Sequence, residues 1–334
     1  MEQSIKDRYY ATVLQEAMQR YGIASNQIQP LAASVNFVYV FERGCQRYIL
    51  RIGHSLHHRE ALVQGEIDWI HYLADHGIAV ARAIRSEGGK LVEAIDDGAG
   101  GQFLATAFVK APGQPVETVG WTPTLYEKYG HLLGSMHALA QHYQPAEATW
   151  KRPSWDDESL AVVERYLPAS EAVAQQKYQA LRARLHCLPK AKTVYGLIHQ
   201  DAHSGNFLVD QAASITLFDF DDCVYSWFIA DIAFVLFAIV MHVQDAPAFT
   251  QAFMPHFLQG YQRANSLDAC WLKEIPLFLN LLEIEVYALM HSEFGASNNG
   301  EWWGVRFMRD RKYKIEQDLP YIDFDFESLS RYLG

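Results

Sequence analysis

The most informative part of the chain reads LIHQDAHSGNFLV over residues 197–209 and ITLFDFDD over residues 215–222. Apolar residues flank each polar cluster, so we expect two short buried strands, 194–198 and 215–220, with the polar clusters at their ends. Charged side chains at such places lose hydration unless they hold a cation or another partner. A hairpin that brings three carboxylates and an asparagine together forms an oxygen cage suited to Mg²⁺. The stretch therefore predicts a magnesium site.

The residues before this stretch predict a small antiparallel sheet. Two β-rich runs, 37–41 and 47–52, are joined across Arg43-Gly44 as in a hairpin. Strands that follow one another through tight turns favour antiparallel pairing. Around the hairpin we expect an amphipathic helix at 5–21, a covering helix at 56–76 that ends at Gly77, and further strands at 78–84, 90–95 and 102–109.

The residues after this sheet predict a larger, mainly helical part. Lys110-Ala111-Pro112-Gly113 breaks the strand pattern and indicates a hinge. We therefore expect an α+β protein with two domains, a β-rich lobe at 1–109 and a helical lobe at 110–334. The expected helices of the second lobe are 122–142, 157–186, 227–242, 246–263 and 267–292.

Composition excludes several classes of protein. The chain has 334 residues, a net charge of -11 and 50% hydrophobic residues, which excludes a coiled coil, a collagen-like fibre and a disordered tail. The acidic balance argues against nucleic acid as a partner. The four cysteines lie far apart, which favours a reducing compartment over a disulfide framework. With no apolar leader, and with Asp231 inside the longest apolar run (229–241), we expect a soluble, cytoplasmic protein without a membrane partner.

The spacing of the polar residues narrows the chemistry. His199, Asp201 and Asn206 form a His-x-Asp-x₄-Asn pattern, and Asp219-Phe220-Asp221 follows after a short strand. This matches the catalytic loop and the metal-binding aspartate of kinase-like phosphotransferases. The order of the β-rich lobe, the hinge, the loop and the aspartates makes a chance match improbable.

On these residues the chain resembles the aminoglycoside phosphotransferase and choline kinase-like superfamily. The likeness runs from about residue 35 to 236, and more weakly to 321. Residues 66–78 and 132–139 are similar to helices of that family, and residues 219–223 are similar to the branch of type II homoserine kinases and bacterial stress-response kinases. The resemblance implies a bilobal protein-kinase-like fold that uses ATP and Mg²⁺.

The same resemblance implies roles for the loop residues. Asp201 is the expected catalytic base, and His203 occupies the place where protein kinases often have a phosphate-contacting lysine. Asn206 and Asp219, with Asp221, are the expected metal ligands. Structural support of the loop is expected from His199 and Asp231.

In the small lobe the resemblance places the nucleotide. Arg51 stands where the family has a Lys or Arg for the phosphates, Glu66 is its expected ion-pair partner, and Val109 is expected beside the nucleotide. Residues 32–36 contain no glycine, so Ser34 and Asn36 are expected to contact phosphate through their side chains. Gln200 also departs from the family pattern, which usually has glycine there.

Acceptor residues are expected in the helical lobe. An aromatic and acidic pocket suits an amine or amino alcohol through cation–π contact and ion pairing. The expected acceptor is therefore a small molecule with a hydroxyl, such as an amino alcohol, an amino acid, a sugar or an aminoglycoside-like compound. The candidates for its site are Asp222, Tyr225, Trp227, Trp302 and Trp303.

Three other functions compete with this one. His199, Asp201 and His203 alternate and would share a face of a continuing strand, as in a metal-dependent hydrolase. A regulator that binds a nucleotide without turnover has the same residues, and a Ser/Thr protein kinase has the same chemistry with a different acceptor. The function favoured by the sequence is an ATP- and Mg²⁺-dependent phosphotransferase acting on a small molecule.

Overall fold

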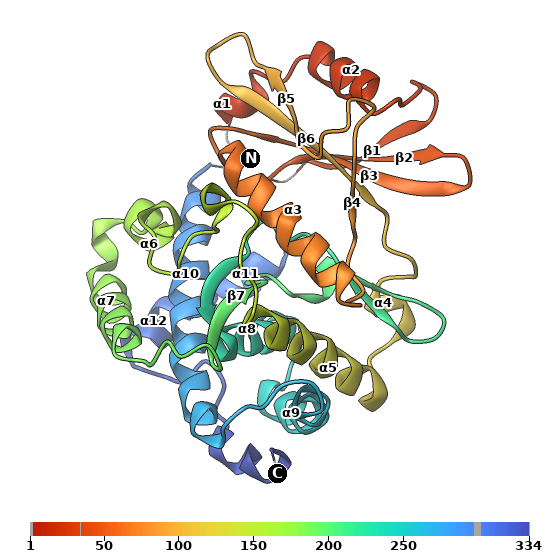
Figure 1. The fold of residues 1–334 in the computed structure, drawn as a ribbon. Coiled ribbons are helices and arrows are strands. Elements are labelled where there is room, and N and C mark those ends of the chain that lie inside the picture. Colours follow the sequence, from red (N-terminus) through yellow and green to blue (C-terminus); the bar gives the residue numbers. More distant parts are fainter. Residues whose placement is uncertain (1–2, 34, 297–301, 334) are drawn as a thin grey trace.

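The computed structural model describes residues 3–33, 35–296 and 302–333. A sheet-based N-lobe stands above a larger helical C-lobe, and the chain ends at the far side of the C-lobe (Figure 1). The structure is thus an α+β fold of two lobes, with an antiparallel sheet in the N-lobe. This confirms the expected fold class.

The N-lobe sheet has six antiparallel strands in the path β1-β2-β3-β6-β4, with β5 paired to β6. Strand β1 was not expected from the sequence. It contains Pro30 and carries a bulge between Pro30 and Ala32, and it tolerates both because it is an edge strand. The strands are β1 (Ile28–Ala33), β2 (Phe37–Arg43), β3 (Gln46–His54), β4 (Ala83–Ile84), β5 (Glu93–Asp96) and β6 (Gln102–Val109).

The two faces of this sheet have different partners. Phe41, Leu50, Ile52 and Phe103 belong to a separate core under the N-terminal helices, α1 (Gln3–Lys6) and α2 (Ala11–Arg20). Because side chains alternate along a strand, the neighbouring residues face the other way, toward the C-lobe. The helix expected at 5–21 is broken at 7–10, where Tyr9 stacks on Phe37 with ring centroids 3.6 Å apart.

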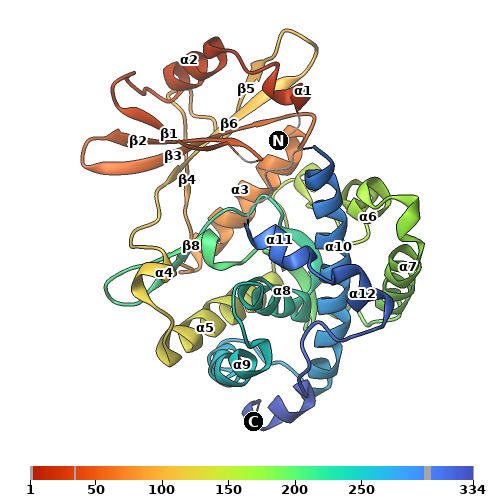
Figure 2. The ribbon, with the colours of Figure 1, turned by 180° about the vertical axis from the view of Figure 1, so that it is seen from behind.

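Helix α3 (Glu60–Asp75) links the lobes, running from beneath the sheet down toward the C-lobe (Figures 1 and 2). Its residues Val63, Ile67, Ile70 and Leu73 belong to the larger core, which is centred on the C-lobe. The helix is followed by Gly77 at φ 85°, the left-handed conformation that glycine adopts readily.

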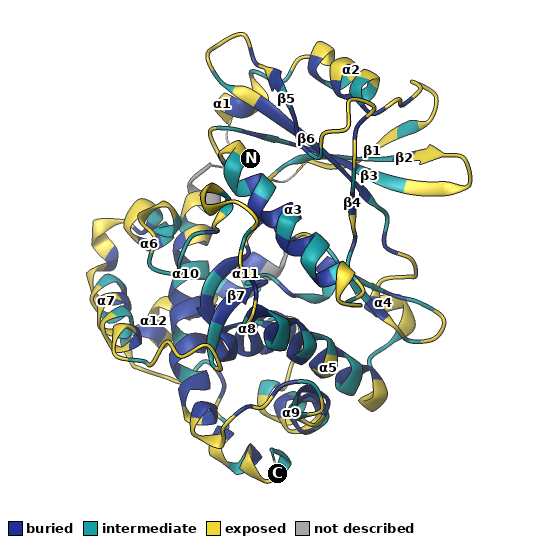
Figure 3. Cartoon of the chain, viewed as in Figure 1, coloured by how far each residue is buried: buried dark blue, intermediate teal, exposed yellow. Residues whose placement is uncertain are grey.

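The C-lobe packs its helices around α8, which is almost wholly buried, whereas α6 and α7 are largely exposed (Figure 3). None of the described helices combines the length and the apolar character that crossing a bilayer requires. The helix expected at 157–186 is interrupted near Pro168, because proline disfavours helix at the residue before it. The helices are α4 (Val116–Val119), α5 (Pro123–Ala140), α6 (Val162–Tyr166), α7 (Ala172–His186), α8 (Phe228–Val240), α9 (Ala246–Gln262), α10 (Ile275–Ala296), α11 (Trp302–Met308) and α12 (Arg311–Glu316).

The strands of the C-lobe pair differently from the prediction. The expected strands 194–198 and 215–220 do not pair with each other. Instead β7 (Tyr195–Ile198) pairs with β10 (Val224–Trp227), and β8 (Phe207–Val209) pairs with β9 (Ile215–Leu217). The polar clusters nevertheless meet, because the β8–β9 hairpin begins at one cluster and ends at the other.

Candidate active site

The loop after β7 is held by buried side chains. Asp231 accepts hydrogen bonds from the backbone N–H groups of His199 (3.1 Å) and Gln200 (2.9 Å). His199 accepts from the Asp201 N–H through Nδ1 (3.3 Å) and donates from Nε2 to the carbonyl of Phe218 (3.1 Å). Burial lowers the pKa of His199, so the ring is neutral at pH 7. Both residues thus hold the backbone of the loop.

Contacts from α5 and α9 extend this support. His137 contacts Asp231 through Nε2 (3.0 Å) and Tyr261 through Nδ1 (2.8 Å). Tyr129, also on α5, donates its hydroxyl proton to the carbonyl of Ala202. The loop is therefore fixed by three elements of the C-lobe core before any ligand binds.

The β8–β9 hairpin brings three polar residues together. The N–H of Phe218 donates to the carbonyl of Asn206 (2.9 Å), so Asn206 and Asp219 lie at adjacent positions of the two chain segments. Asn206 donates from Nδ2 to the carbonyl of Asp201 (2.9 Å) and to its Oδ2 (2.8 Å). These bonds use the nitrogen of the amide and leave its oxygen, Oδ1, available as a ligand.

This cluster fits a hard divalent cation. Asn206 offers an amide oxygen, and Asp219 offers a carboxylate whose side chain is 49% exposed. Magnesium prefers such oxygen ligands and retains water at its other positions. Asp219 adopts φ 63°, a left-handed conformation that turns the chain sharply after β9.

The carboxylates here carry excess negative charge. Burial, followed by the charges of Asp222 and Asp219, raises the pKa of Asp201 to about 8. Burial, followed by the charges of Asp221 and Asp219, raises the pKa of Asp222 to about 7. Each carboxylate thus favours the protonated form of its neighbours, and a cation at this place would remove that repulsion.

Opposite the cluster, Arg51 on β3 and Glu66 on α3 form a buried bidentate ion pair. The two pairs of atoms, Nη1 with Oε1 and Nη2 with Oε2, are 2.9 and 2.5 Å apart. Nη1 of Arg51 also lies 3.5 Å from Oδ1 of Asp219. Burial raises the pKa of Glu66, and Arg51 opposes that rise. The pair expected from the sequence is therefore formed, and it faces the carboxylates of the C-lobe.

Asp221 has a different position from that expected of a metal ligand. Its Oδ2 accepts a hydrogen bond from Asn36 (3.1 Å), and its Oδ1 lies 3.8 Å from Nη1 of Arg51 and 3.6 Å from Nε2 of His58. Asn36 therefore contacts Asp221, and its expected contact with a phosphate stays a prediction. These basic and amide neighbours hold the pKa of Asp221 well below its usual range despite burial.

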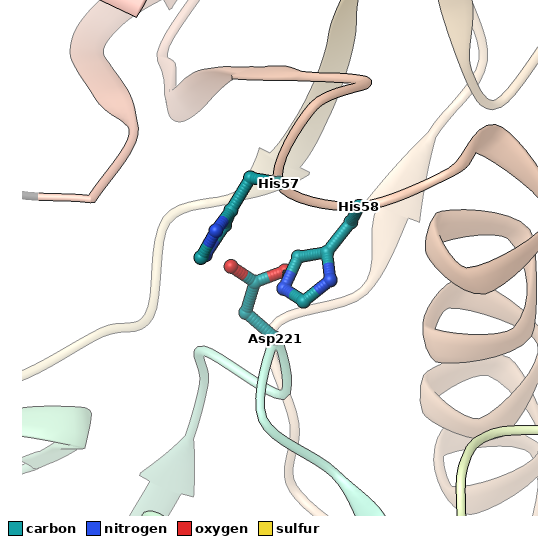
Figure 4. A group of neighbouring side chains, drawn as sticks. All are labelled: His57, His58 and Asp221. Carbon is teal, nitrogen blue, oxygen red and sulfur yellow. Dashed lines mark ion pairs between the residues drawn. The ribbon is translucent and has the colours of Figure 1, made fainter. Parts of the chain in front are cut away.

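Asp221 points between the rings of His57 and His58 (Figure 4). One ligand atom from each of the three residues lies within 4.8 Å of the others, so the set is a candidate cation site. However, Arg51 already balances the charge of Asp221. Asp221 is therefore a contact between the lobes, and its expected role as a metal ligand stays a prediction.

His203 and Ser204 lie at the open side of the loop. Nδ1 of His203 accepts from the N–H of Gly205 (2.9 Å), and its Nε2 lies 3.6 Å from Oδ2 of Asp201. Ser204 donates to Glu117 on α4 (3.0 Å). Because both ring nitrogens of His199 are engaged with backbone, the His199–Asp201–His203 metal cluster of a hydrolase is not formed.

The residues expected to bind the acceptor differ in their exposure. Asp222 is exposed in the cleft, and Tyr225 is half-buried, with the ammonium of Lys151 5.4 Å from its ring centroid. Trp227 was predicted wrongly: it is fully buried and donates from Nε1 to the carbonyl of Pro189, so it cannot touch a ligand. Its apolar neighbours on β7 and α10 explain the burial.

The other expected residues are placed only in part. Ser34 lies outside the described residues, and so do the side chains of Trp302 and Trp303, which begin α11. Val109 is half-buried at the end of β6, and its N–H donates to the carbonyl of Arg82 (2.9 Å).

One buried residue near the site was not expected from the sequence. Arg152 is 4% exposed and donates to the carbonyls of Leu62, Asp221 and Cys223. A single arginine between prolines and tryptophans carries no motif, so the sequence offered no signal for it. Its partners are backbone atoms, which only the folded chain brings together.

Comparison with known proteins agrees with this geometry. A family model described as "Phosphotransferase enzyme family" matches residues 27–274. The chain is 40% identical to amicoumacin kinase of Bacillus subtilis (strain 168) over 324 residues, which cover 95% of each protein. A solved structure of amicoumacin kinase hAmiN in complex with AMP-PNP, Ca2+ and Ami has a TM-score of 0.93 and 38% identity, covering 98% of this chain and 100% of the other.

A more distant structure supports the fold alone. The microcompartment-associated aminopropanol kinase has a TM-score of 0.72 at 23% identity, covering 96% of this chain and 95% of the other. Its similarity extends over both lobes. From the family match and the close relatives, we conclude that the chain belongs to the phosphotransferase enzyme family and is a kinase of that family.

Proposed function

We propose that this protein transfers the γ-phosphoryl group of ATP, with Mg²⁺, to a hydroxyl group of a small molecule. The observation that carries the proposal is the cluster of Asp201, Asn206 and Asp219, which faces the Arg51–Glu66 pair. Phosphoryl transfer depends mostly on positioning and on charge stabilisation, and this arrangement supplies both. The related structure with AMP-PNP and Ca2+ supports a nucleotide and a divalent cation in such a site.

Asp201 acts as the base in this proposal. Asn206 fixes Oδ2 of Asp201 and its backbone carbonyl, which orients the carboxylate. Oδ1 has no hydrogen-bond partner among the described residues, so it is free to accept the proton of the acceptor hydroxyl. Such general-base assistance contributes about 10²–10⁴ in rate. His203, whose Nε2 lies 3.6 Å from Oδ2 of the same carboxylate, is the second catalytic residue of this proposal and is placed to contact the phosphates.

Asn206 and Asp219 would hold the cation through their oxygens. The cation supplies positive charge that offsets the charge developing on the transferred phosphoryl group. Arg51, oriented by Glu66, is placed to bind the phosphates with its planar guanidinium. Ile49 and Phe108 are apolar residues on the face of the sheet toward the C-lobe, and they suit the nucleotide base.

The lobe boundary lies at residues 109 and 110 in this proposal. Val109 ends the last strand of the sheet, and the backbone N–H of Lys110 donates to the carbonyl of Arg47 (3.0 Å). A backbone segment at this place, beside the inward face of the sheet, suits the edge of the base. The structure covers both of these residues, whereas Ser34, the other proposed nucleotide contact, lies outside the described residues.

For the acceptor, we propose an amine-bearing antibiotic of the amicoumacin class. A relative that is 40% identical is named amicoumacin kinase, and the related structure contains Ami. Asp222 lies in the cleft beside Asp201 and offers an exposed carboxylate for an ammonium group. The narrower likeness to type II homoserine kinases stays a prediction, as does the cytoplasmic location. Homoserine is therefore a second acceptor to test.

An ADP-release assay tests the proposal. The acceptors are amicoumacin, homoserine, aminopropanol, an aminoglycoside and an unstructured Ser/Thr-rich protein, each with ATP and Mg²⁺. We expect acceptor-dependent ADP release, a product heavier by one phosphate and a rate about 10²–10⁴-fold lower in Asp201→Asn.

Each other result of this assay points to a different function. ADP release with the protein substrate alone would replace the small-molecule acceptor with a protein. Nucleotide binding without turnover on any acceptor, unchanged in Asp201→Asn, would leave only the regulator.

A further inference from the structure

Arg152 is a buried arginine whose three hydrogen bonds all go to the backbone. Its Nε donates to the carbonyl of Cys223 (2.9 Å), its Nη2 to that of Asp221 (2.5 Å) and its Nη1 to that of Leu62 (3.0 Å). The residue is only 4% exposed. Burying a guanidinium is costly unless its donors are satisfied, and these carbonyls accept from all three of its nitrogens.

The carbonyls belong to the two segments that carry the charges of the site. Asp221 and Cys223 flank Asp222 and lie two and four residues after Asp219. Leu62 lies in the first turn of α3, one turn before Glu66, the partner of Arg51. The side chain of Arg152 therefore links the turn at residues 219–223 to α3, the helix that carries Glu66.

A guanidinium is suited to this task and an ammonium is not. The planar fork of arginine directs its N–H groups at fixed angles, whereas lysine presents a single compact charge. Only a fork reaches carbonyls on both sides at once. The substitution Arg152→Lys keeps the positive charge but removes the forked set of N–H donors.

Neighbouring contacts clamp α3 to the C-lobe independently of Arg152. Tyr143 donates its hydroxyl proton to Asp68 (2.7 Å). A Cβ at Gly65 would lie 1.9 Å from the carbonyl oxygen of Trp150, so glycine permits this close approach. These contacts hold the helix but do not touch residues 219–223. A variant that removes one of these contacts should therefore loosen α3 without changing the turn at residues 219–223.

We propose that Arg152 is a positioning residue of the phosphotransfer site, which holds the 219–223 turn and α3 at the spacing that cation-bound nucleotide requires. It touches no reacting atom and acts through the backbone of Asp221, Cys223 and Leu62. The inference rests on the proposed use of ATP and Mg²⁺. It adds a residue that acts on the cation and the nucleotide by holding the turn that follows Asp219.

The test compares Arg152→Lys with wild type in the full-length protein. We expect the Mg²⁺ concentration that gives half the maximal rate to rise by about tenfold or more, as is typical when a group that orients a metal ligand is lost. The KM for ATP should rise with it. The matched control is Arg82→Lys, which alters an exposed ion pair with Asp75 at the far end of α3.

Two further variants separate positioning from simple stability. Tyr143→Phe loosens α3 without touching the turn, so it should lower the melting temperature and leave the Mg²⁺ dependence unchanged. If Arg152→Lys is not recovered folded, Arg152→Gln, which keeps an amide donor, enters the same assay. The Mg²⁺-dependent rise in melting temperature with AMP-PNP serves as a readout that needs no acceptor.

The possible outcomes are distinct. An unchanged Mg²⁺ half-saturation in a folded Arg152 variant overturns the proposal, and so does the failure of both variants to fold, which would make the residue purely structural. If wild type itself shows no Mg²⁺ dependence with AMP-PNP, the proposed function fails, and the wild-type arm alone reveals this.

Discussion

Two buried arginine–glutamate pairs lie in different parts of the molecule. Arg51 and Glu66 meet between the N-lobe sheet and α3, and both are at most 8% exposed. Arg311 and Glu283 meet between α12 and α10, and both are at most 9% exposed. By burial and pairing alone the two would be equivalent.

Their surroundings separate them. Arg51 has two further carboxylates, Asp219 and Asp221, within 3.8 Å of Nη1, and Asp219 opens toward the cleft. Both guanidinium groups lie over aromatic rings, that of Arg51 5.1 Å from one centroid and that of Arg311 4.2 and 5.1 Å from two, but among the described residues Arg311 pairs with Glu283 alone. The first pair thus has excess negative charge beside it, while the second is enclosed by apolar groups. A buried ion pair indicates function when its charges do not balance locally, and stability when they do.

The largest expected effect is the loss of stability when the Arg311–Glu283 pair is broken. Arg311→Met leaves Glu283 buried without a partner, which should lower the free energy of unfolding by about 3–5 kcal/mol. Urea unfolding measures this, and kcat per folded molecule should stay at the wild-type value. The double variant Arg311→Met/Glu283→Leu should return to within about 1 kcal/mol of wild type, because an apolar pair fits there. A large loss of kcat in the folded double variant would contradict the assignment.

The next effect is on the pair in the cleft. Glu66→Gln removes the group that orients Arg51, so kcat/KM for ATP should fall by about 100-fold, the scale of a small misplacement of a catalytic group. Stability should fall less than in Arg311→Met, because Asp219 and Asp221 still balance Arg51. Steady-state kinetics with urea unfolding on the same preparation checks both. Equal losses of stability in Glu66→Gln and Arg311→Met would show that the two pairs have the same structural role.

A smaller effect concerns the pH dependence of stability in the ligand-free protein. The pKa of Asp201 is raised to about 8, above its value of about 4 in an unfolded chain, so the folded state binds this proton more tightly. The contribution to stability is therefore present at low pH and is lost as the pH rises toward 8. Asp201→Asn should melt at least about 2 °C higher than wild type at pH 8, with a smaller difference at pH 5. Calorimetry in the presence of a chelator measures this, and a constant difference would show that Asp201 is ionised throughout.

The smallest effect is on the backbone of the catalytic loop. Gln200 adopts φ 70°, where a residue with a side chain is strained and glycine is not. Gln200→Gly should raise the free energy of unfolding by up to about 1 kcal/mol and change kcat by less than twofold. Ala213→Gly, at φ 57° in the β8–β9 turn, is the matched control outside the catalytic loop. A gain in the control alone would show that the loop needs its side chain at 200.

Elements with a strong local pattern were predicted well. Strand β6 matches the expected 102–109, and the strands of the 37–52 hairpin and helices α5, α8 and α9 lie within a few residues of their expected bounds. Strand β1 was missed, because Pro30 and two alanines give no strand pattern. Strand β10 was missed because its residues run directly into the apolar helix α8.

Some features of the candidate site could also be predicted from the sequence, and others could not. The spacing of Asp201, Asn206 and Asp219 predicted a cluster that the structure brings together, and the resemblance placed Arg51 opposite Glu66. The sequence did not predict that Asp221 lies beside Arg51 or that Trp227 is buried and donates to the carbonyl of Pro189. A carboxylate beside two others reads the same in sequence whether it binds a cation or an arginine.

The sequence by itself determined the local elements and the order of the catalytic groups, because hydrophobic periodicity and motif spacing are properties of neighbouring residues. Only the tertiary structure decided which strands pair, that α3 joins the core of the C-lobe, and that Arg152 spans from Leu62 to Asp221 and Cys223. Those contacts join residues far apart in the chain, and several of them end on backbone carbonyls. Every residue has a carbonyl, so no amino-acid pattern can mark the ones that become partners.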